Sequence, residues 1–147
     1  MRFMKTIITH SPAETKEFAQ SFAKNLKGGE VLGLVGELGA GKTVFVQGLA
    51  EALGVKEIVN SPTFVLLKAY PILNPKSSIL NLVHIDAYRL DFFEQLKEIG
   101  VEEYLNKKDC LVVVEWADRV PEIKKYLKYR ELLFKEGKIE TERIVKT

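Results

Sequence analysis

Short apolar runs along this chain predict β-strands. Residues 31–35 (VLGLV) and 110–116 (CLVVVEW) are almost entirely apolar, which is typical of strands covered on both faces. Residues 63–70 and 79–86 predict two further strands on either side of a turn that contains two prolines. Residues 2–9 (RFMKTIIT) predict one more strand, at an edge of the sheet.

Apolar residues at helical spacing fill the intervals between these runs. In residues 11–26, apolar side chains recur every four positions, with Ser11 suited to cap the helix and Pro12 to its first turn. Residues 42–53 have the same kind of spacing, and Gly54 can end that helix. Strands and helices therefore follow one another along the chain.

The second half of the chain continues this alternation. Residues 91–105 predict a helical segment that breaks at Gly100, and residues 121–128 predict a short helix. Residues 129–146 predict a terminal β-hairpin with a glycine in its turn. Alternating strands and helices imply a mostly parallel sheet covered on both sides, and the length suits one domain over residues 1–147.

Composition narrows the class of protein only slightly. A net charge of +2 is too small to argue for binding to nucleic acid or to a membrane. The single cysteine, Cys110, excludes an internal disulfide and suits a small buried thiol. The sequence contains no signal-peptide pattern and no apolar stretch of membrane-spanning length, so a reduced, cytoplasmic setting is expected.

The segment GELGAGKT, residues 36–43, carries the most specific chemistry. Gly36, Gly41, Lys42 and Thr43 match the phosphate-binding pattern G-x-x-x-x-G-K-[ST], with a strand before it and a helix after it. The backbone amides would surround an anion at the helix start, Lys42 would reach the β- and γ-phosphates, and the Thr43 hydroxyl would bind Mg²⁺. The remaining loop residues with expected nucleotide contacts are Glu37, Leu38, Gly39 and Ala40.

This motif sets the predicted fold class: a P-loop NTPase-like three-layer αβα sandwich with a mostly parallel central sheet and a C-terminal β-hairpin. Two strands also end in acids, Asp86 and Glu115, at the edge where ligands bind in open α/β sheets. Mg²⁺ prefers such oxygen ligands. Sequence alone leaves open which acid binds the metal directly and which acts through water.

Three further features have competing interpretations. Ser61 and Thr63, in the loop after the second helix, either sense the γ-phosphate or metal or simply form a turn. His84 either helps to orient Asp86 or is a packed core residue. Residues 106–109 (NKKD) match a guanine-reading motif but precede a strand instead of following one, so ATP is expected rather than GTP.

Five motifs in order, GELGAGKT, SPTF, HIDAYRL, EIGVEEYL and VVVEW, resemble the TsaE family, also called YjeE. This family comprises small ATPases of bacterial tRNA threonylcarbamoyladenosine (t6A) synthesis. The likeness runs from about Ser11 to Trp116, with a compatible hairpin behind it.

The resemblance implies roles for individual positions. Thr43 and Glu115 would hold Mg²⁺, and Asp86, which also counts as a candidate metal ligand, would serve hydrolysis. With Lys42, the two acids form the expected catalytic group. Further nucleotide contacts are expected from Ser11, Thr15, Ser61, Thr63, Trp116 and Lys138, where Lys138 stands in the place of a family basic residue.

The resemblance also implies a function. It indicates a Mg²⁺-dependent ATPase, weak alone, that acts on a complex of TsaD and TsaB and resets it between turnovers, with tRNA contacted indirectly. Arg89 is the nearest candidate for an in-chain arginine finger, the alternative being a surface ion pair. Two other functions stay open: a small P-loop kinase for a small molecule, and a nucleotide-gated binding module without useful hydrolysis.

Overall fold

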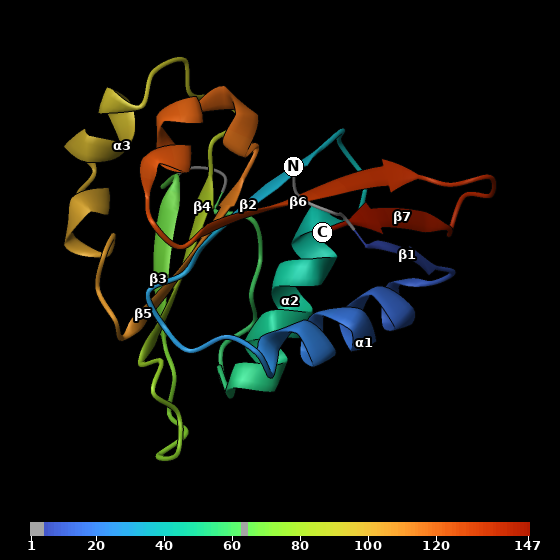
Figure 1. Ribbon diagram of the computed structural model, residues 1–147, viewed down its shortest axis with the longest axis horizontal. Helices are drawn as coiled ribbons and strands as arrows, with labels where there is room; N and C mark the ends of the chain where they lie inside the picture. The colour runs from blue at the N-terminus through green and yellow to red at the C-terminus, as the bar shows by residue number, and fades with distance from the viewer. Residues whose placement is uncertain (1–4, 63–64) are drawn as a thin grey trace.

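The computed structural model describes residues 5–62 and 65–147, and the strands within them form one seven-stranded sheet in the order β1-β7-β6-β2-β5-β4-β3. Figure 1 shows this sheet between two layers of helices. The strands are β1 (Thr6–Thr9), β2 (Val31–Gly36), β3 (Leu67–Pro71), β4 (Asn81–Asp86), β5 (Cys110–Glu115), β6 (Tyr129–Glu136) and β7 (Arg143–Lys146). The helices are α1 (Pro12–Ala23), α2 (Lys42–Leu53) and α3 (Glu94–Glu98), with 3₁₀ turns η1 (Val101–Glu103), η2 (Ala117–Arg119) and η3 (Pro121–Lys125).

The sheet is mixed: its centre is parallel, as expected, and its outer strands add antiparallel pairs. The central strands β6, β2, β5 and β4 run parallel, whereas β3, β7 and β1 each pair antiparallel with a neighbour. Hairpin connections join β3 to β4 and β6 to β7, and a hairpin can only produce an antiparallel pair. The expected edge position of β1 and the terminal hairpin are confirmed.

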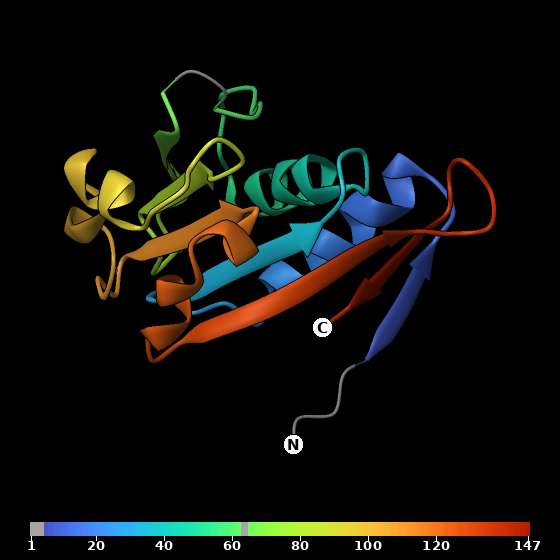
Figure 2. The ribbon, with the colours of Figure 1, turned by 90° about the horizontal axis from the view of Figure 1, so that it is seen from above.

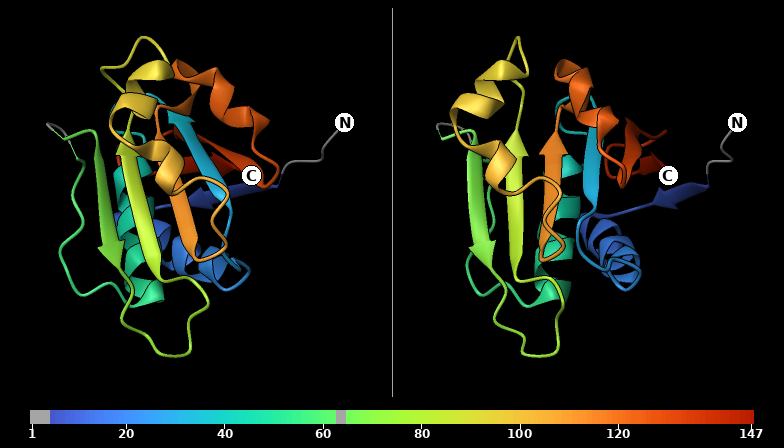
Figure 3. Two further views of the ribbon diagram at one scale, coloured as in Figure 1. Left: turned by 90° about the vertical axis from the view of Figure 1, so that its left-hand side faces the viewer. Right: turned by 60° about the vertical axis from the view of Figure 1, so that its left-hand side comes forward.

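Alternating side chains of the central strands divide the core between the two layers. Leu32 and Leu34 of β2 face α1 and α2, while Val31 belongs to the second core cluster, with residues of α3 and the 3₁₀ turns. Figures 2 and 3 show α1 and α2 on one face of the sheet and these shorter helices on the other. The result is a three-layer α/β fold.

Local signals set the ends of the two main helices. The Ser11 hydroxyl accepts a hydrogen bond from the Glu14 amide, which confirms the predicted N-cap of α1. Gly41 and Gly54 flank α2 with φ of 101° and 92°, a left-handed conformation that glycine adopts without strain. The bounds of α2 therefore match the predicted 42–53.

Other predicted elements are shorter than expected. Helix α1 ends at Ala23, and residues up to Leu26 continue in tighter turns. The segment 91–105 contains only α3 and η1, separated by Gly100 at φ 91° as predicted. The predicted helix 121–128 is the 3₁₀ turn η3. Among the described residues, no helix is both long and apolar enough to cross a membrane.

Helices α1 and α2 are in very close contact at Gly48. A Cβ added there would lie 2.7 Å from the Ala19 Cβ and 2.8 Å from the Lys16 carbonyl oxygen. Nearby, Phe45 of α2 packs against Phe22 and Phe134 with ring centroids 5.7 and 5.5 Å apart. This packing fixes α2 against both α1 and the sheet.

We predict that Gly48→Ala lowers the free energy of unfolding by about 1 kcal/mol. Alanine favours a helix by about 1 kcal/mol over glycine, but overpacking typically costs about 1–3 kcal/mol. Urea unfolding of the ligand-free protein, followed by circular dichroism, measures the net effect. Ala52→Gly, at an exposed position of the same helix, is the control for helix propensity. An increase in stability for Gly48→Ala would contradict the close approach.

Candidate nucleotide-binding site

The loop between β2 and α2 is shaped by glycines. Gly39 and Gly41 have φ of 80° and 101°, and Gly41 is the residue that immediately precedes α2. The first amides of an α-helix have no intrahelical acceptor, and the helix dipole adds partial positive charge at the same place. The loop thus presents backbone donors to an anion at the start of α2.

Lys42 is the first residue of α2, and its side chain is only 5% exposed. Its Nζ donates hydrogen bonds to the carbonyl oxygens of Gly36 and Glu37, the latter at 2.8 Å. The ammonium also lies 4.2 Å from the centroid of the Trp116 ring. Burial lowers the pKa of Lys42, and the nearby Glu115 carboxylate opposes that shift. The cation is therefore held inside the loop.

Thr43 connects the start of α2 to the end of β5. Its Oγ1 lies 3.0 and 3.1 Å from the two carboxylate oxygens of Glu115, which is 3% exposed. Glu115 is paired in the parallel sheet with Asp86 of β4. The two acids predicted from strand ends therefore lie side by side at the carboxyl ends of β4 and β5. Glu115 is the one in contact with the Thr43 hydroxyl.

Asp86 joins two loops. One carboxylate oxygen accepts a hydrogen bond of 2.6 Å from the Ser61 hydroxyl, and the other accepts one of 3.0 Å from the Tyr88 amide. Ser61 thus contacts a site residue, which agrees with its interpretation as a residue that senses the phosphate or metal and not only as part of a turn. The other loop residue with an expected contact, Thr63, lies outside the described residues.

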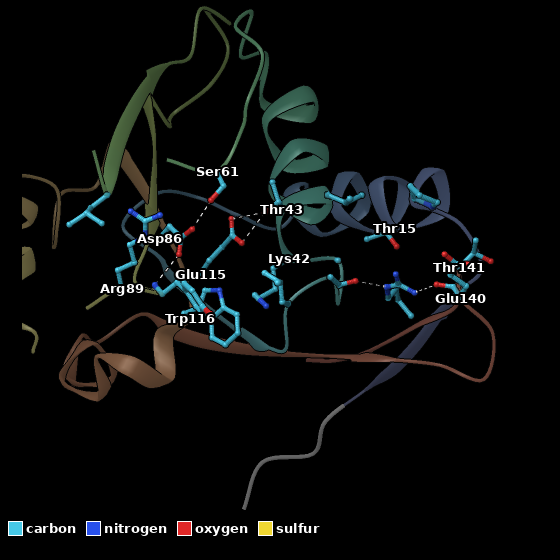
Figure 4. A pocket seen from close by; sticks show the side chains of 18 residues that line it. Thr15, Lys42, Thr43, Ser61, Asp86, Arg89, Glu115, Trp116, Glu140 and Thr141 are labelled. Atoms are coloured by element: carbon cyan, nitrogen blue, oxygen red, sulfur yellow. Dashed lines mark hydrogen bonds between the residues drawn. The ribbon is translucent and has the colours of Figure 1, made fainter. Parts of the chain in front are cut away.

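A cavity of about 630 Å³ contains these groups, a size within the usual range for small-molecule sites. Figure 4 shows Asp86, Glu115 and Trp116 at one end, Lys42 and Thr43 in the middle, and Glu140 and Thr141 at the other end. The sequence-predicted residues that line it are Thr15, Leu38, Gly39, Gly41, Lys42, Thr43, Ser61, Asp86, Glu115 and Trp116, together with Arg89, the candidate arginine finger.

The other expected contacts within the described residues do not belong to this lining. Ser11 caps α1, and Ala40 is buried. Gly36 and Glu37 contribute through their carbonyl groups, which accept from Lys42. The lining from the terminal hairpin is Glu140, Thr141 and Arg143 in place of the expected Lys138, whose amide donates to the Glu142 carboxylate at 2.8 Å.

Two prominent lining residues carried no expected nucleotide contact of their own: Arg143, and Tyr88, which stands in the HIDAYRL motif. The Arg143 Nε donates to the Gly39 carbonyl at 3.1 Å, so β7 supports the glycine-rich loop directly. The Tyr88 ring lies 4.8 Å from the Trp116 ring, centroid to centroid. The position of Tyr88 two residues after Asp86 was a usable signal, whereas the role of Arg143 depends on how the hairpin folds back.

The oxygen donors of the site fit the Mg²⁺ that accompanies a nucleotide. In residues 5–62 and 65–147, no cluster of three or more His, Cys, Asp or Glu side chains could hold a metal ion. Mg²⁺ in nucleotide sites is typically held by one or two carboxylates together with phosphates and water. The pairing of Thr43 with Glu115 supplies protein oxygens of this kind.

Comparison with known proteins shows similarity over most of the chain. Residues 9–145 match the family model described as "Threonylcarbamoyl adenosine biosynthesis protein TsaE". A relative from Bacillus subtilis (strain 168), named "tRNA threonylcarbamoyladenosine biosynthesis protein TsaE", is 44% identical over 115 residues, which cover 78% of this chain and 67% of the relative. A relative of the same name from Aquifex aeolicus (strain VF5) is 40% identical over 121 residues, or 81% of each chain.

A solved structure is similar over nearly the whole chain. The crystal structure of YdiB from Bacillus subtilis superimposes with a TM-score of 0.74 and 33% sequence identity. The match covers 99% of this chain and 85% of the other. The family match, the identity of the relatives and the shared fold establish that this chain belongs to the TsaE family, which takes part in the biosynthesis of threonylcarbamoyladenosine in tRNA.

Proposed function

We propose that this chain is a Mg²⁺-dependent ATPase that acts on the TsaB–TsaD complex and resets it between rounds of t6A synthesis. The observation that carries the proposal is the meeting of Lys42, Thr43, Asp86 and Glu115 in one cavity. Family membership supports the t6A pathway, and the site chemistry supports nucleotide hydrolysis as the contribution of this chain. A cytoplasmic location and an indirect contact with tRNA follow as parts of the same proposal.

We assign a separate role in nucleotide binding or hydrolysis to each group of residues in the cavity, according to its position. The first amides of α2 and the Lys42 ammonium would bind the phosphates, and Thr43 with Glu115 would hold Mg²⁺. The metal would neutralise charge that develops on the phosphates during transfer. Asp86 is already fixed by Ser61 and the Tyr88 amide, so a remaining lone pair can accept a hydrogen bond from the attacking water.

The nucleotide base would lie toward α1 and the hairpin. Thr15, Glu140 and Thr141 line the end of the cavity opposite to Asp86, and the Arg143 guanidinium donates to the Glu140 carbonyl group. The NKKD segment, residues 106–109, precedes β5 and contributes no lining residue. This arrangement supports ATP over a guanine nucleotide recognised through that motif.

We predict that Lys42→Ala weakens MgATP binding by about 100-fold, because a buried charge-assisted hydrogen bond contributes about 1.5–3 kcal/mol. Isothermal titration calorimetry measures the affinity without relying on Trp116, whose fluorescence would respond to the loss of the neighbouring ammonium. Lys135→Ala removes an exposed lysine from β6 and is the matched control. Equal affinity for wild type and Lys42→Ala would refute the phosphate role of the loop.

We predict that Asp86→Asn binds MgATP within about 3-fold of wild type but releases phosphate at least about 100-fold more slowly, a typical effect of losing a positioned proton acceptor. Phosphate release is measured with TsaB and TsaD present and without any added acceptor, which also separates hydrolysis from kinase activity. Asp91→Asn, at an exposed position on the following loop, is the control. Hydrolysis at the wild-type rate by Asp86→Asn would remove this residue from the mechanism.

Reconstitution tests the function as a whole. This chain, TsaB, TsaD, tRNA and the substrates of t6A synthesis are combined, and modified adenosine is counted per TsaD. Repeated turnover with wild type and a single round with Asp86→Asn is the expected result. Repeated turnover without this chain, or without ATP hydrolysis, would overturn the proposal.

A further inference from the structure

His84 is a completely buried polar side chain beneath the site. It lies on β4 with 0% exposure, and its Nε2 is 2.5 Å from a carboxylate oxygen of Glu115. Its burial agrees with the interpretation of His84 as a packed core residue, but its polar contact is with Glu115 and not with Asp86, the partner in the other interpretation. In the sheet register His84 is opposite Val113, which makes Glu115 its diagonal neighbour on the same face.

The Glu115 carboxylate is held from two sides. The Thr43 hydroxyl lies 3.0 and 3.1 Å from its two oxygens, and His84 binds the oxygen Oε2. The other ring nitrogen of His84, Nδ1, has no hydrogen-bond partner among the described residues. The polar contact of His84 is therefore directed entirely at Glu115.

Core stability does not explain a histidine at this place. Of its neighbours in the sheet, Val83, Ile85 and Val113 are apolar and fully buried, and Lys68, opposite it on β3, is exposed. Replacing a buried polar pair by well-packed apolar residues is often neutral or stabilising, and an unpartnered buried nitrogen adds a further cost. A functional role for the contact with Glu115 would explain why a histidine, and not an apolar residue, occupies this buried position.

We infer that His84 is a positioning residue that holds the Glu115 carboxylate in the orientation required for Mg²⁺. This inference rests on the proposed function. Mg²⁺ demands near-ideal octahedral geometry, so a carboxylate that rotates freely would bind it less well. Hydrogen-bonding partners behind a metal ligand typically contribute about 10–100-fold in metal affinity.

The test compares ATP binding with Mg²⁺ and with EDTA. We predict that His84→Leu, which removes the donor, leaves ATP affinity in EDTA within about 3-fold of wild type. The gain in affinity on adding Mg²⁺ is expected to fall by about 10–100-fold. His84→Gln places an amide nitrogen near the position of Nε2 and is expected to restore most of that gain.

Two further variants separate positioning from packing. Val113→Ala removes buried volume opposite His84 without a polar contact to Glu115, so it is expected to lower the melting temperature and keep the Mg²⁺ gain. His84→Asn carries the same amide as His84→Gln on a side chain one carbon shorter, and is expected to lose the gain. If His84→Leu does not fold, the difference in Mg²⁺ gain between His84→Asn and His84→Gln tests the positioning role instead.

The outcomes distinguish this inference from the proposed function. A full Mg²⁺ gain in both His84→Leu and His84→Asn would overturn the positioning role while the proposed function stands. Equal losses with Mg²⁺ and with EDTA would also overturn it, because they would indicate a structural role. Absence of any Mg²⁺ gain in wild type would refute the proposed metal site itself, and this inference with it.

Discussion

The hydrogen bond from Thr43 to Glu115 joins two parts of the chain that are 72 residues apart. Thr43 is placed by the start of α2, and Glu115 by the end of β5. Both placements depend on the parallel register in which Leu34 and Asp86 flank Glu115 on neighbouring strands. A shift of one residue would turn Glu115 to the opposite face of the sheet, so sheet register is the constraint on which the site depends.

Elements with strong local signals could be predicted from the sequence. The bounds of α2 follow from two glycines in left-handed conformation, and the apolar run of β5 is buried along its whole length, as expected. The antiparallel pair of the terminal hairpin could be predicted too, whereas the pairing of β1 with β7 could not, because pairing between distant segments depends on the whole fold and not on composition. The short α3 shows the same limit: Gly100 breaks the helix as expected, but helical spacing before it does not extend the helix to residue 91.

Some residues of the candidate site could likewise be predicted from the sequence, and others could not. Lys42 and Thr43 come from one contiguous motif, and the rule that parallel strands end at one edge brings Asp86 and Glu115 together. Arg143 was missed because its contact with Gly39 depends on how the hairpin folds back over the loop. The burial of His84 agrees with its interpretation as a core residue, but its contact with Glu115 could not be predicted, since that neighbour is visible only once the register of β4 and β5 is known.

The environments of the two acids support different chemical roles. Glu115 is almost fully buried, and its oxygens are engaged by a hydroxyl and a histidine that leave it little freedom. Asp86 is half-buried and held by the hydroxyl of a loop residue and by a backbone amide. Carboxylates in unlike surroundings commonly divide a reaction between them. A rigid carboxylate suits a metal with strict geometry, whereas a less buried carboxylate with free lone pairs suits a water molecule. Burial and hydrogen bonding therefore support the proposed division, with the metal at Glu115 and the attacking water at Asp86, beside the family resemblance.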